Sequence, residues 1–351
     1  MNVQQIRTLL AEGLVIPAQP LALDEVGRLS ERHQRAISRY YLDAGAGGIA
    51  VGVHSTQFAI RDSQHGLFEP VLRLAVEEID RHVVRTGRPV LKIAGLCGPT
   101  PQAGAEARLA VRLGYHAGLL SLAALADRGI DELVAHAAAT AREMPIIGFY
   151  LQPAVGGRVL PLEFWRRFVE IDAVVAIKVA PFNRYQTIDV IRAVVEAGRD
   201  DIAIYTGNDD SIVVDLLTTW AFDREATRVR RHVAGGLLGH WGVWTRRAVE
   251  MLERIKAARA AGMIAADWLT EAAAVTDMNA AVFDAAHGFR GCIPGILEVL
   301  RRQGLAPSNR CLDPHETLSP GQAAELDRVT RSYPHLVDDE FVRENLDRWL
   351  A

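Results

Sequence analysis

Cysteine, lysine and long apolar runs are all scarce in this chain of 351 residues. The three cysteines, Cys97, Cys292 and Cys311, are too few and too widely spaced for a disulfide framework, so we expect a protein of the reducing cytoplasm. No apolar run approaches the roughly 18 residues that cross a bilayer, and the N-terminal segment lacks the apolar core of a signal peptide. The sequence therefore excludes an integral membrane protein.

The charge balance excludes a further class of protein. The 39 basic and 43 acidic residues leave a net charge of −4, and no Lys/Arg-rich run stands out, which argues against nucleic-acid binding. Only three of the basic residues are lysines, namely Lys92, Lys178 and Lys256. Apolar residues make up 49% of the chain, enough for a sizeable core and too many for a disordered protein.

Short apolar segments alternate with longer segments of helical period along the first 260 residues. Eight such pairs are typical of a (β/α)8 TIM barrel. A doubly wound sheet is the competing fold, but its glycine fingerprint follows a strand, whereas Gly45–Gly48 follows a helix. Strands are predicted over 13–19, 47–54, 89–95, 116–122, 145–152, 173–180, 202–207 and 235–241. Helices are predicted over 24–43, 69–85, 101–113, 128–142, 161–170, 184–197 and 210–221.

The pattern changes after the eighth strand. Only helical segments follow, and Ser319 with Gln322 offers a good start signal for the last of them. We therefore expect a barrel over residues 1–263 and a C-terminal helical region over 264–351. The helices of this end of the chain are predicted over 244–262, 267–287, 293–303 and 320–332.

Lys178 is the first candidate for chemistry, because it lies within the apolar strand segment AVVAIKVAP. Burying an ammonium group without a partner is costly, and a neutral lysine is a nucleophile that forms Schiff bases with carbonyl compounds. A lysine that is paired across the barrel, or that extends its end to solvent, is the structural alternative. Tyr150 ends the preceding strand, where a phenol can shuttle protons or simply pack.

Tyr150 and Lys178 lie 28 residues apart, and with other segments this spacing resembles the dihydrodipicolinate synthase / N-acetylneuraminate lyase family of class I aldolases. In that family a tyrosine and a lysine on strands five and six have the same spacing. The resemblance covers most of the chain and includes four further segments: GGIAVGVHST, YTGNDD, GGLLG and TLSP.

The resemblance implies a Schiff-base lyase or aldolase that acts on a 2-oxo acid such as pyruvate. Lys178 would form the imine, Tyr150 would relay protons, and no metal or organic cofactor would be needed. The substrate carboxylate would bind the strand-two loop through Ser55 and Thr56, if that loop is two residues longer than in the family. Aligned without a gap, His54 takes a threonine position and could bind the carboxylate, act as an acid or base, or only hydrogen-bond.

The resemblance also implies further contacts and partners. Gln152, Asn208 and Asp209 are candidate contacts to a polar substrate, and the chain is expected to form a homodimer or homotetramer. The segment after strand four has no tyrosine and only Ser121 as a polar residue, and Val155 stands near the place of the carboxylate-binding arginine of dihydrodipicolinate synthases. The sequence therefore does not predict that synthase activity.

Three alternatives stay open. Lys92 is a second candidate for the imine. Asp209 and Asp210 could bind a metal in a metal-dependent aldolase or hydrolase, although such residues more often cap a helix. The barrel could also have lost catalysis and kept a binding or regulatory role.

Overall fold

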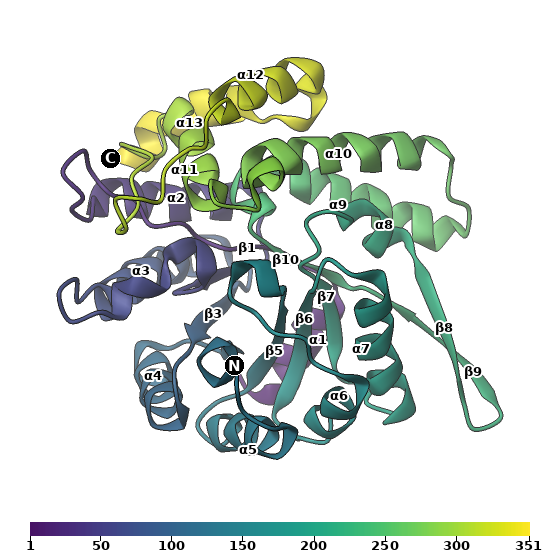
Figure 1. The fold of residues 1–351 in the computed structure, drawn as a ribbon. Helices are drawn as coiled ribbons and strands as arrows, with labels where there is room; N and C mark the ends of the chain where they lie inside the picture. The colour runs from purple at the N-terminus through teal and green to yellow at the C-terminus, as the bar shows by residue number, and fades with distance from the viewer. The chain divides into compact units, whose positions relative to one another are not determined.

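The computed structural model describes residues 1–351. The chain divides into two compact units, which are described one at a time (Figure 1). Unit 1 contains residues 1–14 and 93–237, and unit 2 contains residues 15–92 and 238–351. None of the helices combines the length and apolar character that crossing a membrane requires.

The fold is a (β/α)8 barrel with additional C-terminal helices, which confirms the predicted fold class. Eight strands form one sheet in the order β1-β10-β7-β6-β5-β4-β3-β2. All eight predicted strands are present, within a few residues of their predicted bounds. They are β1 (Val15–Pro17), β2 (Gly48–Val51), β3 (Leu91–Leu96), β4 (Ala117–Leu120), β5 (Ile146–Leu151), β6 (Val174–Ala180), β7 (Ala203–Thr206) and β10 (Gly235–Leu238).

Unit 1 holds the strands β3 to β7 and the helices that connect them. Its strands pair in parallel, and β5 and β6 are buried almost throughout, as expected of strands covered on both faces. The Tyr205 hydroxyl donates to the Leu10 carbonyl at 2.8 Å and accepts from the Leu14 N–H at 3.1 Å, which fixes the N-terminal helix to β7. The helices are α1 (Val3–Ala11), α4 (Thr100–Leu113), α5 (Ile130–Ala141), α6 (Leu162–Phe168), α7 (Arg184–Glu196) and α8 (Ile212–Leu217).

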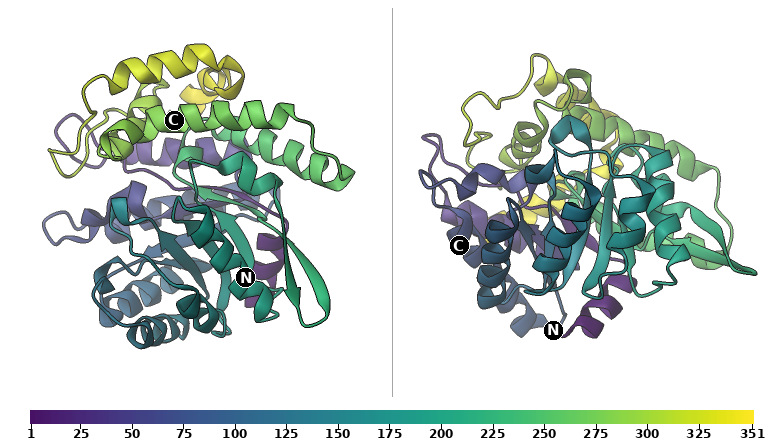
Figure 2. Two further views of the ribbon diagram at one scale, coloured as in Figure 1. Left: turned by 45° about the vertical axis from the view of Figure 1, so that its right-hand side comes forward. Right: turned by 60° about the horizontal axis from the view of Figure 1, so that its bottom comes forward.

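A two-stranded ribbon interrupts the alternation in unit 1 and was not predicted. Its strands, β8 (Thr219–Arg224) and β9 (Thr227–His232), are antiparallel and pack beside α7 (Figures 1 and 2). The helix predicted over 210–221 is therefore wrong beyond Leu217. Burial alternates along β9, where Val229 and Arg231 are less exposed than their neighbours, as is typical of a strand with one covered face; in β8 only Trp220 is buried.

Unit 2 contains the C-terminal helices. The helix predicted from residue 24 begins only at Glu31, because the Asp24 carboxylate accepts the N–H groups of Val26 and Arg28 and holds a turn there. The predicted cap at Ser319 is wrong, because the helix begins at Gln322 with Gly321 as its N-cap, and the Ser319 hydroxyl donates to Asp284 instead. Ser319 and Gln322 still meet, since Ser319 N–H donates to Gln322 Oε1 at 3.1 Å. The helix α13 was not predicted. The helices are α2 (Glu31–Ala44), α3 (Phe68–Thr86), α9 (Thr245–Ala261), α10 (Asp267–Phe283), α11 (Cys292–Arg302), α12 (Gln322–Ser332) and α13 (Asp339–Leu350).

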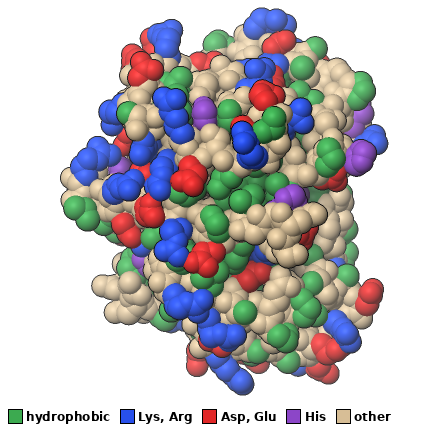
Figure 3. Space-filling view, turned by 90° about the vertical axis from the view of Figure 1, so that its left-hand side faces the viewer, with side chains coloured by type: hydrophobic (Ala, Val, Ile, Leu, Met, Phe, Trp, Pro, Cys, Tyr) green, Lys and Arg blue, Asp and Glu red, His purple; other side chains and the backbone are tan.

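Ion pairs account for much of the arginine in the chain. In unit 2 the buried Glu78 carboxylate of α3 binds Arg35 and Arg39 of α2 at 2.9 Å each, and also binds Arg81. The planar guanidinium supplies several donors in a fixed geometry, which a lysine does not. On the face drawn in Figure 3, basic and acidic side chains are interspersed.

Candidate active site

The register of β5 and β6 in unit 1 sorts their side chains onto two faces of the sheet. Phe149 pairs with Lys178 and Tyr150 pairs with Val179, and successive residues of a strand point to opposite faces. A methyl group on Gly148 would lie 2.7 Å from the Phe168 ring of α6. Gly148 and Tyr150 therefore belong to the face covered by helices, called the helix face below. Phe149 and Lys178 belong to the opposite face, called the Lys178 face.

Lys178 lies on β6, two residues before the carboxyl end of the strand, and is only 8% exposed. Its Nζ lies 4.4 Å from the centre of the Phe149 ring, a distance at which a cation is attracted to the ring face. The lysine arm crosses Gly207, where a methyl group would lie 2.6 Å from Lys178 Cε. The structure thus places Lys178 where a (β/α)8 barrel carries its chemistry, in a narrow space.

Tyr150 lies on the helix face. Its ring packs against Trp165 of α6 with 5.3 Å between ring centres, and its Oη accepts the Leu160 N–H at 3.1 Å. Burial raises the pKa of the phenol above its ordinary value. The structure does not bring Tyr150 together with Lys178, so its geometry gives no support to a proton relay between the two.

The other candidates of unit 1 differ in how fully the fold uses their side chains. Asn208 donates to Thr187 Oγ1 at 3.1 Å and to Asp215 Oδ2 at 2.9 Å, and its Oδ1 accepts the Phe182 N–H at 3.0 Å. Those bonds use its amide in joining loops to α7 and α8. Asp209 is 5% exposed directly after β7, and Gln152 is 8% exposed directly after β5. Of the three, Asn208 is thus the residue whose amide the fold is seen to use, and the substrate contacts of Gln152 and Asp209 stay predictions.

The strand-two loop belongs to unit 2, and two of its hydroxyls hold backbone. Ser55 Oγ donates to the Ala18 carbonyl at 2.9 Å, and Thr56 Oγ1 donates to the Gln19 carbonyl at 2.7 Å. Thr56 Oγ1 also accepts the Gly52 N–H at 2.9 Å. The hydroxyl protons of Ser55 and Thr56 are thus committed to the fold. The His54 ring lies edge-on to Phe58, with 6.1 Å between ring centres.

The remaining lysines have structural partners. Lys92 Nζ donates to Asp80 Oδ1 at 2.7 Å in unit 2, and Lys256 pairs with Glu253 at the same distance on α9. The ion pair of Lys92 favours its structural reading over imine formation.

No group of three or more His, Cys, Asp or Glu side chains in the structure is arranged to hold a metal ion. The burial of Asp210 raises the pKa of its carboxyl, and the nearby Asp215 adds to this effect. Asp209 and Asp210 therefore do not form part of a metal-ligand cluster.

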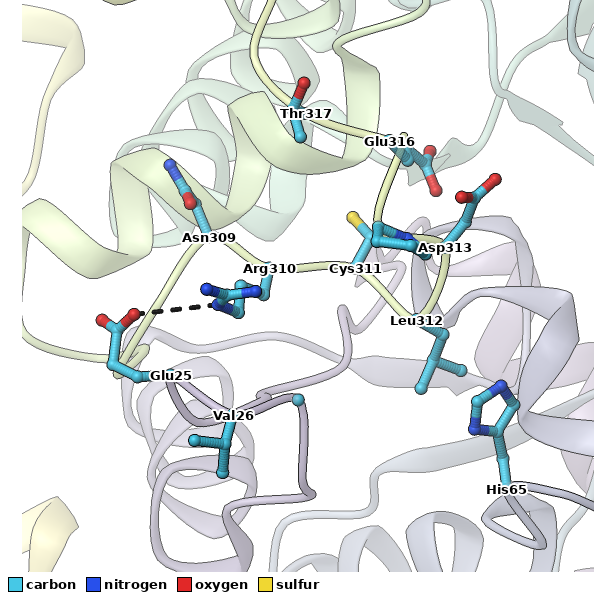
Figure 4. A pocket seen from close by; sticks show the side chains of 12 residues that line it. Glu25, Val26, His65, Asn309, Arg310, Cys311, Leu312, Asp313, Glu316 and Thr317 are labelled. Atoms are coloured by element: carbon cyan, nitrogen blue, oxygen red, sulfur yellow. Dashed lines mark ion pairs between the residues drawn. The ribbon is translucent and has the colours of Figure 1, made fainter.

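Unit 2 contains a cavity of about 540 Å³ between a C-terminal loop, the turn at Glu25 and His65 (Figure 4). Glu25 and Arg310 form an ion pair at 3.8 Å across it. Burial raises the pKa of the Glu316 carboxyl, as does the neighbouring Asp313, and burial also raises the pKa of the Cys311 thiol. Its lining contains none of the site residues predicted from the sequence.

Phe149 and Gly207 were missed by sequence reasoning. The strand segment IIGFYL is apolar on both faces, so its composition does not reveal which residues share a face with Lys178. The only signal is the register of the strands, which becomes visible in the structure.

Comparison with known proteins gives a match in structure and none in sequence. No protein-family model and no curated protein matches the chain. Among solved structures, N-acetylneuraminate lyase from Fusobacterium nucleatum has 16% identity and a TM-score of 0.70, over 92% of this chain and 99% of that one. Dihydrodipicolinate synthase from Oceanobacillus iheyensis has 14% identity and a TM-score of 0.74, over 95% of this chain and 100% of that one.

A second synthase, DapA-2 from Bacillus anthracis, has 18% identity and a TM-score of 0.70, over 92% of this chain and 98% of that one. At such identities the likeness establishes the fold. The chain thus has the fold of the N-acetylneuraminate lyases and dihydrodipicolinate synthases, and the resemblance drawn from its sequence motifs is confirmed at the level of the fold.

Proposed function

We propose that the protein is a class I lyase or aldolase that forms a Schiff base between Lys178 and a 2-oxo acid such as pyruvate. The observation that carries the proposal is the placement of Lys178, buried near the carboxyl end of β6 between the Phe149 ring and Gly207. The fold shared with N-acetylneuraminate lyase and dihydrodipicolinate synthase supports it.

The chemistry follows from a lysine amine in an enclosed site. The neutral amine attacks the ketone carbon, the carbinolamine takes up one proton from solvent, water leaves, and a protonated imine forms. This cation withdraws electrons, so the bond between C3 and C4 of the acid can break, or form in the reverse direction. The Phe149 ring lies 4.4 Å from Nζ, where it attracts the positive charge of the protonated imine once that has formed. The proposed reaction needs no metal or organic cofactor.

The placement of Tyr150 on the helix face supports a second candidate, a barrel of the same fold that has lost catalysis and kept a binding or regulatory role. The committed hydroxyls of Ser55 and Thr56 point the same way, because they leave fewer donors for a substrate carboxylate. Our proposal therefore needs a direct test of imine formation. A homodimer or homotetramer and a cytoplasmic location remain part of the proposal, carried by the family resemblance and the scarce cysteines.

Borohydride trapping tests the proposal directly. The protein is incubated with pyruvate and a panel of other 2-oxo acids, reduced with sodium borohydride, and read by intact mass and then by peptide mapping. With only three lysines in the chain, the modified residue is assigned without ambiguity. Lys178→Ala removes the proposed nucleophile, and Lys256→Arg on α9 is the matched control.

We expect one adduct on Lys178, absent from Lys178→Ala and present in Lys256→Arg. An adduct on Lys92 would keep the chemistry and refute the assignment of the site. A folded protein that gives no adduct with any acid would refute the lyase and favour the barrel without catalysis.

A further inference from the structure

Ser121 follows β4 in unit 1 and lies on the Lys178 face. Leu119 pairs with Ile147, and the Ser121 N–H continues the ladder by donating to the Leu96 carbonyl at 2.9 Å. Two residues further along both strands, Ser121 therefore stands beside Phe149, which in turn pairs with Lys178. A serine hydroxyl and the lysine amine thus share one face, two strands apart.

The hydroxyl of Ser121 is buried, and its proton is not used by the fold. The residue is 4% exposed, and its Oγ accepts the Ala123 N–H at 3.4 Å. The structure offers no acceptor to the O–H itself, although buried hydroxyls are normally hydrogen-bonded. Around it the Lys178 face carries Phe149, Leu151 and Ala180, none of which has a polar side-chain atom. Ser121, directly after β4, is thus the side chain near the ends of β4 and β5 that can donate a hydrogen bond on the Lys178 face.

We propose that Ser121 donates a hydrogen bond to the C4 oxygen of a 4-hydroxy-2-oxo acid held as an imine on Lys178. This inference rests on the proposed function and names a contact to its substrate. The backbones of Ser121 and Lys178 are separated by about 10 Å, two strand spacings of roughly 4.8 Å. The lysine arm covers part of this separation, and a four-carbon acid joined to Nζ spans the rest.

The C4 oxygen changes its chemical state in the reaction: it is a hydroxyl in the intact acid and a carbonyl oxygen in the aldehyde product. In cleavage the C3–C4 bond breaks, its electron pair passes to C3 and the imine nitrogen, and the C4 hydroxyl becomes an aldehyde as its proton leaves to water. Ser121 keeps its own proton throughout and holds the oxygen in place. With one hydroxyl among apolar side chains, this part of the Lys178 face suits a short aldehyde with one oxygen better than a polyhydroxylated chain.

Two acids that differ in one hydroxyl test the proposal. Borohydride trapping is titrated with 2-oxobutyrate and with 4-hydroxy-2-oxobutyrate, and the half-saturating concentrations are compared. The adduct mass separates intact acid from cleaved pyruvate. Variants are Ser121→Ala, Ser121→Thr as the conservative replacement, and Ser332→Ala at the exposed end of α12 as the control.

We expect the wild type and the Ser332→Ala control to favour the hydroxylated acid about 10-fold, the size of one hydrogen bond. Ser121→Ala should lose this preference while still trapping 2-oxobutyrate, and Ser121→Thr should retain it. Adducts with both acids but no preference in the wild type, or a preference that survives in Ser121→Ala, would overturn the role of Ser121 alone. No adduct with either acid would overturn the imine and the role of Ser121 together.

Discussion

Gly207 gives the sharpest test of how Lys178 is positioned. The substitution Gly207→Ala adds a methyl group 2.6 Å from Lys178 Cε and 2.8 Å from Ala180 Cβ. The first distance is about 1 Å short of an ordinary carbon–carbon contact of 3.5 Å, so the lysine arm must move. A displacement of that size at a reacting group costs on the order of 100-fold in rate. The contact with the short Ala180 side chain is relieved less easily and adds about 1–3 kcal/mol of lost stability, as in other overpacked cores.

The measurement is the rate of borohydride trapping with pyruvate, together with the free energy of unfolding in urea. Gly104→Ala on α4 is the matched control, because its added methyl group meets only the flexible end of Arg108 at 3.4 Å. That control should gain about 0.5–1 kcal/mol from helix propensity and trap normally. A Gly207→Ala protein with wild-type trapping and wild-type stability would refute the packing of Lys178 against Gly207.

Two further predictions concern Tyr150 and His240. Tyr150→Phe removes the acceptor of the buried Leu160 N–H, so we expect the free energy of unfolding in urea to fall by about 1–3 kcal/mol. The rate of borohydride trapping on Lys178 should stay unchanged. A trapping rate reduced 10-fold or more would restore Tyr150 as a proton relay. Burial lowers the pKa of His240 to about 4, against about 6.5 in the unfolded chain. The unfolded state therefore binds the extra proton between pH 6.5 and 4, and folding stability falls by up to about 3 kcal/mol as the pH drops through this range. His240→Gln should flatten that part of the stability profile, and an unchanged slope would contradict the burial of the ring.

The sequence predicts the barrel well because its strands are apolar and its helices are amphipathic. The segment VVAIKVA is buried throughout, so its run of apolar residues identifies a strand whatever its register. The ribbon of β8 and β9 carries charged residues in its strands, so neither an apolar run nor a helical period revealed it. Local hydrogen bonds are also not predicted from the sequence. The turn held by the Asp24 carboxylate is one example, and because of it α2 begins later than predicted.

The candidate site is predicted less completely for a physical reason. A spacing of 28 residues places Tyr150 and Lys178 on neighbouring strands but does not determine the faces to which they point. That depends on the register of β5 and β6, which shifts between Ile146 and Ile147. A slip of one residue moves a side chain to the other face of a sheet, and both faces of β5 are apolar. Lys178 was therefore identifiable from its surroundings, and Ser121 as the one polar residue after strand four, whereas the face that both share with Phe149 was not.

The ribbon of β8 and β9 has a consequence for the behaviour of the protein at high concentration. It forms a sheet of two strands only, so each strand leaves one edge of N–H and C=O groups without a strand partner. Such edges invite the strands of another molecule and can seed aggregation. Charged side chains along its strands, such as the exposed Arg230 and the Arg228–Asp223 ion pair at 3.0 Å, disfavour such pairing, because a second strand would have to desolvate them. We therefore expect the charged side chains of the ribbon to hinder edge-to-edge pairing between molecules.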